Sequence, residues 1–230
     1  MTSLVAACAL FFLIHSLIAG TGVRFAIAGR IGEKPYRGLF SVVSLGSLVW
    51  MAMSYNWVSE TGSKLLWFFG YAGHGIAVIL VLLAFLFAVV GMTSRNPTSV
   101  EQEGLLREPE PAKGIQRITR HPFLVGVVLW STAHLIANGD LGSVIFFATF
   151  LLVALVGMAN IDRKRARQDP EGWARFAAQT SRLPFLAIAQ GRNRFSAAEL
   201  GWWRILLAIV LYGVILYLHG WMFGVPVIAH

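Results

Sequence analysis

Residues 123–160 read FLVGVVLWSTAHLIANGDLGSVIFFATFLLVALVGMAN, and this stretch decides the fold class. Two apolar runs, 123–138 and 141–160, meet at Asn138-Gly139-Asp140, which has the composition of a tight turn. Each run approaches the ~20 apolar residues that a helix needs to cross the hydrocarbon core of a bilayer. The stretch therefore predicts two antiparallel transmembrane helices joined by a short turn.

The rest of the chain has the same character. Of its 230 residues, 57% are hydrophobic and 13% are charged, and the mean hydropathy is +0.66. Soluble domains carry roughly 25% charged residues, and so apolar a chain would not stay disordered. Four further segments have the length and composition of spans: 4–20, 39–58, 65–92 and 202–228. We predict one all-α domain over residues 1–230, a polytopic integral membrane helical bundle of about six transmembrane helices.

The distribution of Lys and Arg predicts how the bundle is oriented. Nearly all of these residues fall after the first, third and fifth predicted spans, and the other loops between spans contribute only Lys64. Cytoplasmic loops are enriched in Lys and Arg, so both termini are expected on the outer side of a bacterial inner (cytoplasmic) membrane. The net charge of +8 is then explained by contact with membrane lipids, and no nucleic-acid partner is expected.

The two long basic loops differ in composition. In the loop 93–122, residues 93–120 mix acidic and basic side chains with three prolines, which predicts irregular structure. In the loop 161–201, residues 161–181 have helical spacing, with Trp173 and Phe176 on one side and many arginines around them. This pattern predicts an amphipathic helix that lies on the membrane surface.

The six histidines are the candidate functional residues. Ionisable side chains inside a membrane are costly and usually face the bundle interior to serve a site. The alternative is that each buried histidine is neutral and bonds a neighbouring helix. The candidates at membrane depth are His15, His74 and His134; His121 lies before Pro122 at a cytoplasmic mouth, and His219 and His230 lie late in the last span and at the C-terminus.

The residues around these histidines limit the chemistry. Cys8 is the only cysteine, and the sequence has no H-E-x-x-H motif, which argues against disulfides and zinc hydrolysis. Imidazole without carboxylate suits haem, copper or zinc, and the aromatic and small neighbours favour a flat apolar haem. Without a C-x-x-C-H motif the haem would be of b type.

Several motifs resemble those of the NnrU family and of its plastid relatives, the 15-cis-zeta-carotene isomerases. The most specific is Arg-Ile-Thr-Arg-His-Pro at 117–122, followed thirteen residues after its histidine by His134. Further similarity lies at Ile14-His15-Ser16, at 32–45, at Ala133-His134-Leu135 and at Asp162-Arg163-Lys164. The resemblance covers most of the chain.

The resemblance implies a haem b protein whose axial iron ligands are His15 and His134. It implies cis–trans isomerisation of a carotenoid-type polyene by iron that is active only when reduced, and hence a redox partner. The isomerases have a cysteine where this chain has Ser131, so their thiolate exchange is not expected here. NnrU proteins proper are similar to denitrification accessories, so a protein that handles or responds to nitric oxide is the alternative function.

The two proposed ligands lie at different expected depths, because His134 is near the outer end of its span and His15 is near the inner end of its own. His74, near mid-membrane, is therefore the alternative ligand. Arg117 and Arg120 either bind haem propionates or are part of the positive charge of a cytoplasmic loop, and Trp130 either contacts the haem edge or packs in the core.

Arg120-His121-Pro122 is also similar to the isoprenylcysteine-type membrane methyltransferases, which makes an S-adenosylmethionine site at His121 a third, weaker hypothesis.

Overall fold

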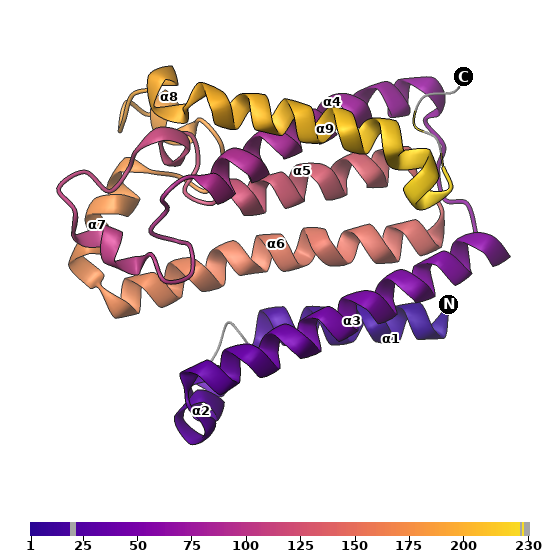
Figure 1. The fold of residues 1–230 in the computed structure, drawn as a ribbon, viewed down its shortest axis with the longest axis horizontal. Coiled ribbons are helices and arrows are strands. Elements are labelled where there is room, and N and C mark those ends of the chain that lie inside the picture. Colours follow the sequence, from indigo (N-terminus) through magenta and orange to yellow (C-terminus); the bar gives the residue numbers. More distant parts are fainter. Residues whose placement is uncertain (19–21, 226, 228–230) are drawn as a thin grey trace.

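The computed structural model describes residues 1–18, 22–225 and 227, and in this part of the chain the architecture is all-helical (Figure 1). The only β-type pairing described there is an isolated bridge between Leu65 and Asp140. The last residues of the first predicted span (19–20), residues 226 and 228 of the last one, and His230 lie outside the described residues.

The helices follow one another with short connections, apart from two long segments at 94–121 and 180–201. The α-helices are α1 (Thr2–Leu13, extended by the π-helical turn η1, Ile14–Ile18), α2 (Gly22–Ile31), α3 (Glu33–Thr61), α4 (Gly70–Thr93), α5 (Pro122–Ala137), α6 (Leu141–Gln168), α7 (Pro170–Gln179), α8 (Leu186–Ala189) and α9 (Trp202–Phe223). Short 3-10 turns are η2 (Glu103–Arg107), η3 (Gly114–Arg117) and η4 (Ala197–Leu200).

Four of these helices, α3, α4, α6 and α9, are long and apolar enough to cross a membrane. The pair formed by α1 with η1 and α2 bends by 82° and makes a fifth span if it is counted as one. Helix α5 is apolar but has 16 residues, which is about 24 Å against a ~30 Å hydrocarbon core. The protein is thus a polytopic integral membrane bundle, with four or five candidate spans where about six were predicted.

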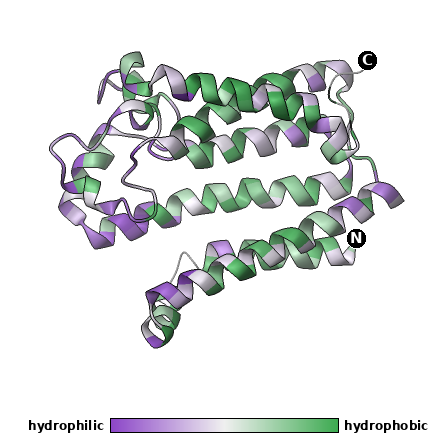
Figure 2. Ribbon diagram, in the orientation of Figure 1, coloured by the Kyte–Doolittle hydropathy of each residue, from purple (hydrophilic) through white to green (hydrophobic). Residues whose placement is uncertain are grey.

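The long helices lie roughly side by side in the order α9, α4, α5, α6, α1, α3 (Figure 1). Close approach of α4 and α5 depends on small residues, because a Cβ on Gly126 would lie 2.8 Å from the Ala84 carbonyl oxygen. Most large hydrophobic side chains of α3 and α9 are exposed, and Figure 2 shows hydrophobic residues along all the long helices. Lipid would cover these faces in a membrane.

The two ends of the bundle differ in polarity. Helix α2, the 94–121 segment and the 169–201 segment gather at one end, which is strongly hydrophilic (Figure 2). We call this the basic end. The opposite end carries the N-terminus and the turn between α5 and α6 (Figure 1), and we call it the turn end.

At the turn end, residues 65–69 clamp the α5–α6 turn, which is why α4 begins at Gly70 and not at the predicted residue 65. The Leu66 amide donates to the Gly139 carbonyl (2.8 Å) and the Trp67 indole donates to the Leu135 carbonyl (2.9 Å). A Cβ on Gly139 would lie 1.9 Å from the Trp67 carbonyl oxygen, so this position requires glycine. Asp140 caps α6 by accepting from the Ser143 amide.

The structure corrects the prediction of one surface helix over residues 161–181. Helix α6 continues to Gln168, and Asp169 then caps a separate helix, α7, by accepting from the Gly172 amide. Trp173 and Phe176 are buried together with Leu106 and Ala112 of the 94–121 segment. The apolar side of the amphipathic pattern is thus covered by the chain itself and not by lipid. It packs against the 94–121 segment, which is irregular, as predicted, apart from the turns η2 and η3.

Candidate functional site

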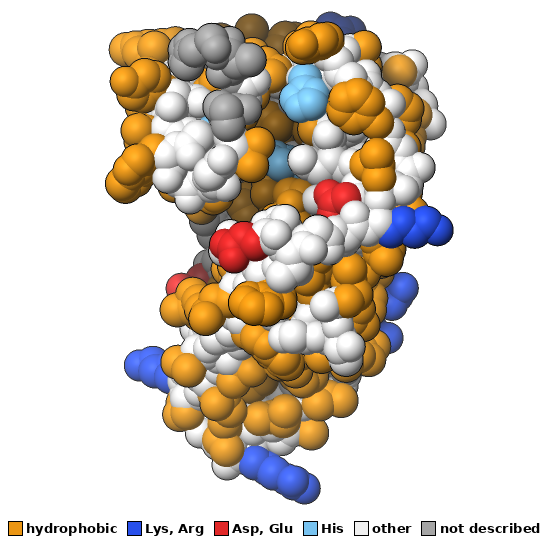
Figure 3. All heavy atoms as spheres, turned by 90° about the vertical axis from the view of Figure 1, so that its right-hand side faces the viewer, with side chains coloured by type: hydrophobic (Ala, Val, Ile, Leu, Met, Phe, Trp, Pro, Cys, Tyr) orange, Lys and Arg blue, Asp and Glu red, His pale blue; other side chains and the backbone are white. Residues whose placement is uncertain are grey.

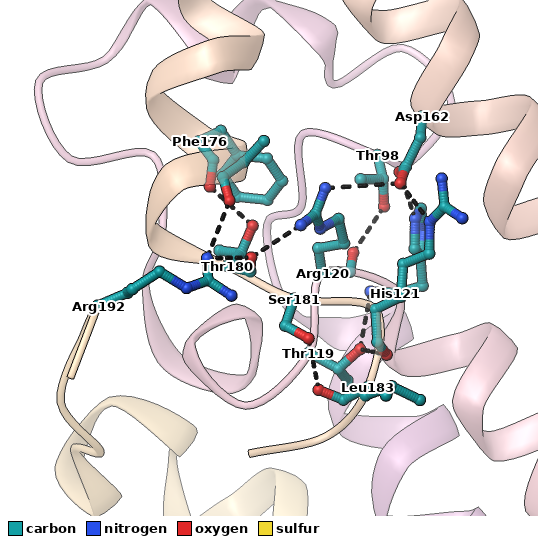
Figure 4. Close-up of polar contacts among 12 residues, drawn as sticks. Thr98, Thr119, Arg120, His121, Asp162, Phe176, Thr180, Ser181, Leu183 and Arg192 are labelled. Carbon is teal, nitrogen blue, oxygen red and sulfur yellow. Dashed lines mark hydrogen bonds and ion pairs between the residues drawn. The ribbon is translucent and has the colours of Figure 1, made fainter. Parts of the chain in front are cut away.

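The predicted site residues lie mainly in two separate regions of this apolar molecule. One is a network at the basic end, shown in Figure 4, which connects the 94–121 segment, α6 and the segment that follows α7. The other comprises the histidines of the helical bundle and the aromatic rings around them. The predicted site residues divide between these two regions.

Asp162 is the centre of the network at the basic end. Its carboxylate, 8% exposed, accepts from His121 Nε2 at 2.7 Å and from Arg182 Nε at 2.6 Å, and it pairs with Arg120 Nη1 at 3.5 Å (Figure 4). It lies on the continuation of α6 beyond the predicted span, facing the residues that precede α5. A single carboxylate is therefore shared by three cationic or polar partners.

Arg120 and its neighbours extend the network through backbone groups. Arg120 Nη2 donates to the Thr180 carbonyl at 2.8 Å, and its guanidinium lies over the Trp173 ring. Thr119 Oγ1 donates to the Arg182 carbonyl at 2.8 Å, and Thr98 Oγ1 donates to the Arg120 carbonyl at 3.0 Å. We call Thr119, Arg120, His121, Asp162, Thr180 and Arg182 the basic network.

The basic network keeps His121 neutral. Burial lowers the pKa of His121 below its usual value, and the neighbouring Arg120 and Arg182 act in the same direction against the opposing Asp162 carboxylate. The neutral ring then donates its Nε2–H to Asp162. This arrangement orients α5, because Pro122 follows directly as the first residue of the helix.

Arg117 lies outside the basic network and bonds to Glu199. Its Nε and Nη2 donate to the two carboxylate oxygens of Glu199 at 2.9 and 3.1 Å, and the Gly114 amide donates to the same carboxylate at 2.6 Å. These bonds hold the pKa of Glu199 below its ordinary value. Arg117 thus anchors the segment that leads into α9.

His134 lies in the last turn of α5 with an aromatic surround. Its Nδ1 lies 2.8 Å from the Trp130 carbonyl, and its ring stacks on Phe147 of α6 with centroids 4.6 Å apart. Trp130, one turn before it, has its ring centroid 4.8 Å from the imidazole. The Nδ1–H is therefore directed to the backbone, as in many metal-binding histidines, and Nε2 has no hydrogen-bond partner among the described residues.

His15 is oriented in the same way in η1, with Nδ1 2.9 Å from the Phe11 carbonyl. The structure does not bring it to His134. The rings of Phe11, Phe150 and Trp130 form a contact chain from His15 to His134, with neighbouring centroids 4.1 to 5.4 Å apart. Asn160 of α6 donates to the carbonyl of Ser16, next to His15, whereas His134 stacks on Phe147 of the same helix. Asn160 comes thirteen residues after Phe147, about 20 Å along the helix, so the two histidines lie at different depths.

The other predicted residues are also separated from His134. His134 comes thirteen residues after His121, about 20 Å along the helix, so Arg117, Arg120 and His121 belong to the opposite end of α5. His74 is exposed near the start of α4, with Nδ1 3.0 Å from the Gly70 carbonyl. Ser131, three residues before His134, is fully buried, and its hydroxyl has no hydrogen-bond partner among the described residues.

The surroundings of His134 suit a residue that would hold a haem. The ring is oriented through its Nδ1, Nε2 has no hydrogen-bond partner among the described residues, and the flanking rings of Trp130 and Phe147 are apolar. Within the described ranges, no group of three or more His, Cys, Asp or Glu side chains is placed to hold a bare metal ion.

Two features of the site were missed by sequence reasoning. Asp162 was noted only as part of a motif, although its spacing of three from Arg165 places two buried charges on one face of α6. The rings of Phe11, Phe147 and Phe150 were not singled out, because the order in which the helices pack was not predictable.

The fold and these side chains define a polytopic integral membrane protein with ring-flanked histidines inside its helical bundle. The profile of the NnrU protein family matches residues 3–227, and the chain therefore belongs to the NnrU family.

Two curated relatives, both named 15-cis-zeta-carotene isomerase, chloroplastic, are similar to most of the chain. The Arabidopsis thaliana protein is 30% identical over 187 residues and the Zea mays protein is 28% identical over 186 residues. Each alignment covers 80% of this chain but only 49% and 50% of the relatives, respectively. The chain thus spans about half the length of the curated relatives it matches. No solved structure matches the fold.

Proposed function

We propose that this protein is a haem b-dependent cis–trans isomerase of a carotenoid-type polyene or a similar hydrophobic substrate. The observation that carries the proposal is the environment of His134: its Nδ1 lies against a backbone carbonyl, Trp130 and Phe147 flank its ring, and its Nε2 has no hydrogen-bond partner among the described residues. The distant relationship to proteins named as isomerases of such a polyene supports the same reading.

In this proposal the chain's own residues position the reaction. His134 would hold the haem, and Trp130 and Phe147 would exclude water from its faces. Reduced haem, when bound, would supply an electron-rich iron that weakens one double bond enough for rotation without net oxidation. The exposed hydrophobic faces of α3, α4 and α9 would let a substrate that is dissolved in the bilayer reach the bundle laterally.

The proposal also places the protein in a bacterial inner membrane with its basic end in the cytoplasm. The loops rich in Lys and Arg gather at one end of the bundle (Figure 1), as the positive-inside rule requires. A redox partner would supply the electrons. In a Cys8→Ala background, a cysteine at Gly62 should be labelled by a membrane-impermeant reagent only from the outer side, and labelling from the cytoplasm would overturn this orientation.

Two measurements test the proposed function. The protein purified from haem-sufficient cells should show a Soret band and a b-type pyridine haemochrome, and His134→Ala should lose most of the bound haem. The protein should also restore trans product in a carotenoid pathway that lacks its isomerase. Folded wild-type protein without haem would overturn the cofactor. Bound haem without isomerisation would favour the nitric-oxide-linked accessory function instead.

A further inference from the structure

A small cavity lies at the basic end, where α4 ends and α9 begins. Its volume is about 160 Å³, which gives room for several water molecules or for a small charged group. Its wall is formed by residues that follow α4, by the 94–121 segment and by the start of α9, and the charged side chains that line it are Arg95, Glu108, Glu110, Lys113, Glu199 and Arg204. None of these residues belongs to the basic network, so the cavity is a third polar region of the molecule.

Half of the charges that line the cavity are paired within the chain. Glu108 pairs with Arg95 at 2.7 Å, and Glu199 pairs with Arg117 at 2.9 Å. The other three charged side chains have no ion-pair partner in the part of the chain that the structure describes, and they are Glu110, Lys113 and Arg204. Two cations and one carboxylate are thus available to a ligand that carries charges of both signs.

Arg204 is the cation that points most directly to an anionic ligand. Its Nε is buried and has no hydrogen-bond partner among the described residues, which is costly for a charged donor. Its Nη1 donates to the Leu200 carbonyl at 3.2 Å, and its guanidinium lies over the Trp203 ring. Arg204 also lies in the first turn of α9, which has no acidic residue and no capping side chain. Because the N-terminal end of a helix is electropositive, an anion in the cavity would offset both the helix dipole and the arginine charge.

The cavity lies at the depth where a bilayer changes from hydrocarbon to polar headgroups. Both α4 and α9 are candidate spans, and the cavity lies where the first ends and the second begins. Next to Arg204, the side chains of Trp202 and Trp203 are 77% and 46% exposed, and tryptophan is enriched at membrane–water interfaces. The turn end, shown in Figure 3, presents mainly hydrophobic and uncharged side chains with scattered charges. The headgroups of the leaflet at the basic end therefore lie level with the cavity.

We propose that this cavity binds the headgroup of a phospholipid that carries a phosphodiester and a primary ammonium, as phosphatidylethanolamine does. The phosphodiester would accept charge-assisted hydrogen bonds from Arg204 and Lys113, and the ammonium would donate to Glu110. The acyl chains would lie on apolar side chains that α4 and α9 expose near the cavity, such as Met92 and Leu206. The lipid would thus join α4, α9 and the 94–121 segment, and its binding does not depend on the proposed cofactor.

The headgroup is tested by native mass spectrometry of the purified, delipidated protein. The probes are phosphatidylethanolamine, phosphatidylcholine and phosphatidylglycerol with the same acyl chains. Phosphatidylcholine keeps both charges but has no N–H to donate to Glu110, and phosphatidylglycerol keeps the phosphodiester without an ammonium. Phosphatidylethanolamine should therefore bind at least several-fold more tightly than either of the others. Equal binding of the three lipids, or displacement of bound lipid by an excess of inorganic phosphate, would overturn the inference.

Matched variants test the location of the site. Arg204→Gln and Lys113→Gln should each weaken phosphatidylethanolamine binding about ten-fold, because each removes a charge-assisted hydrogen bond. Lys113 is exposed, so Lys113→Gln tests the site even if Arg204→Gln fails to fold. Glu110→Gln should lower phosphatidylethanolamine binding to the level of phosphatidylglycerol and should not weaken phosphatidylglycerol binding.

Arg194→Gln is the matched control, because Arg194 is an exposed cation at the same end that does not line the cavity. Its lipid binding should equal that of the wild type. Equal losses in Arg194→Gln and Lys113→Gln would show only a general attraction of the basic end for phospholipid and would overturn the inference. Wild-type binding in both Lys113→Gln and Arg204→Gln would overturn it as well.

Discussion

The basic network and the histidines of the turn end are both polar groups in an apolar molecule, but their atoms are satisfied in different ways. Asp162, Arg120 and Arg182 bond mainly to one another and to the backbone. His134 uses Nδ1 on the Trp130 carbonyl, and its Nε2 has no hydrogen-bond partner among the described residues. A carboxylate that is bonded to several partners of the chain holds the fold, whereas a ring nitrogen without such a partner is available for a ligand.

The largest effect is expected when the centre of the basic network is neutralised. Asp162→Asn would leave the buried Arg120 guanidinium without its carboxylate, and breaking a buried ion pair from one side costs about 3–5 kcal/mol. We expect a steep loss of folded yield and of thermal stability in detergent. The matched control Glu171→Gln removes an exposed acid and should change stability by less than about 0.5 kcal/mol. Equal stabilities of the two variants would show that the network is not structural.

This contrast also indicates what the sequence could predict. The helical class, the turn at 138–140 and the grouping of basic loops follow from local composition, because apolar length and Lys/Arg position act within one segment. The basic network and the separation of His15 from His134 depend on which helices are neighbours. That order is set by contacts such as Gly126 on Ala84 and Gly139 under Trp67, which no single segment reveals.

A second prediction tests whether close packing of α4 and α5 holds the two regions in place. A Cβ on Gly126 would lie 2.8 Å from the Ala84 carbonyl oxygen and 2.9 Å from the Ala88 Cβ. Gly126→Ala should therefore cost about 1–3 kcal/mol through overpacking. Gly157→Ala is the matched control in α6, where the new Cβ would meet only Leu124 at 3.7 Å, and its higher helix propensity should leave stability unchanged or raised. Thermal unfolding in detergent separates the two outcomes, and a destabilised Gly157→Ala would contradict this packing argument.

A third prediction concerns the pH dependence of the basic network. Because burial lowers the pKa of His121 in the folded protein, the unfolded chain binds a proton there first as the pH falls. The stability that depends on a neutral His121 is thus fully present above the unfolded pKa of about 6.5. It is lost as the pH falls below that value, by at most about 1.4 kcal/mol per pH unit.

His121→Gln is the variant that isolates this effect. The glutamine amide can still donate to Asp162 but does not titrate, so its thermal stability should fall less than that of the wild type between about pH 7 and pH 5. His74→Gln serves as the control at an exposed histidine and should follow the wild-type profile. Parallel curves for His121→Gln and wild type would mean that His121 is not held neutral by the network.

The smallest effect is expected at the edge of the basic end, where Glu199 holds the segment before α9. Its carboxylate bonds to Arg117 and to the Gly114 amide, but Glu199 is one-third exposed and Arg117 one-fifth exposed. Water and salt screen such a pair, so its contribution is about 0–1 kcal/mol, well below that of the buried Asp162. Glu199→Gln should therefore lower thermal stability slightly, and the loss should shrink at high salt.

A double-mutant cycle with Arg117→Gln measures the coupling energy of the pair. A coupling energy as large as the cost of Asp162→Asn would show that the screened Glu199 carboxylate matters as much as the buried Asp162 carboxylate, and would contradict the distinction between them. A small coupling, with bound haem unchanged, would show that Arg117 acts on the docking of α9 and not on the cofactor about 20 Å away along α5.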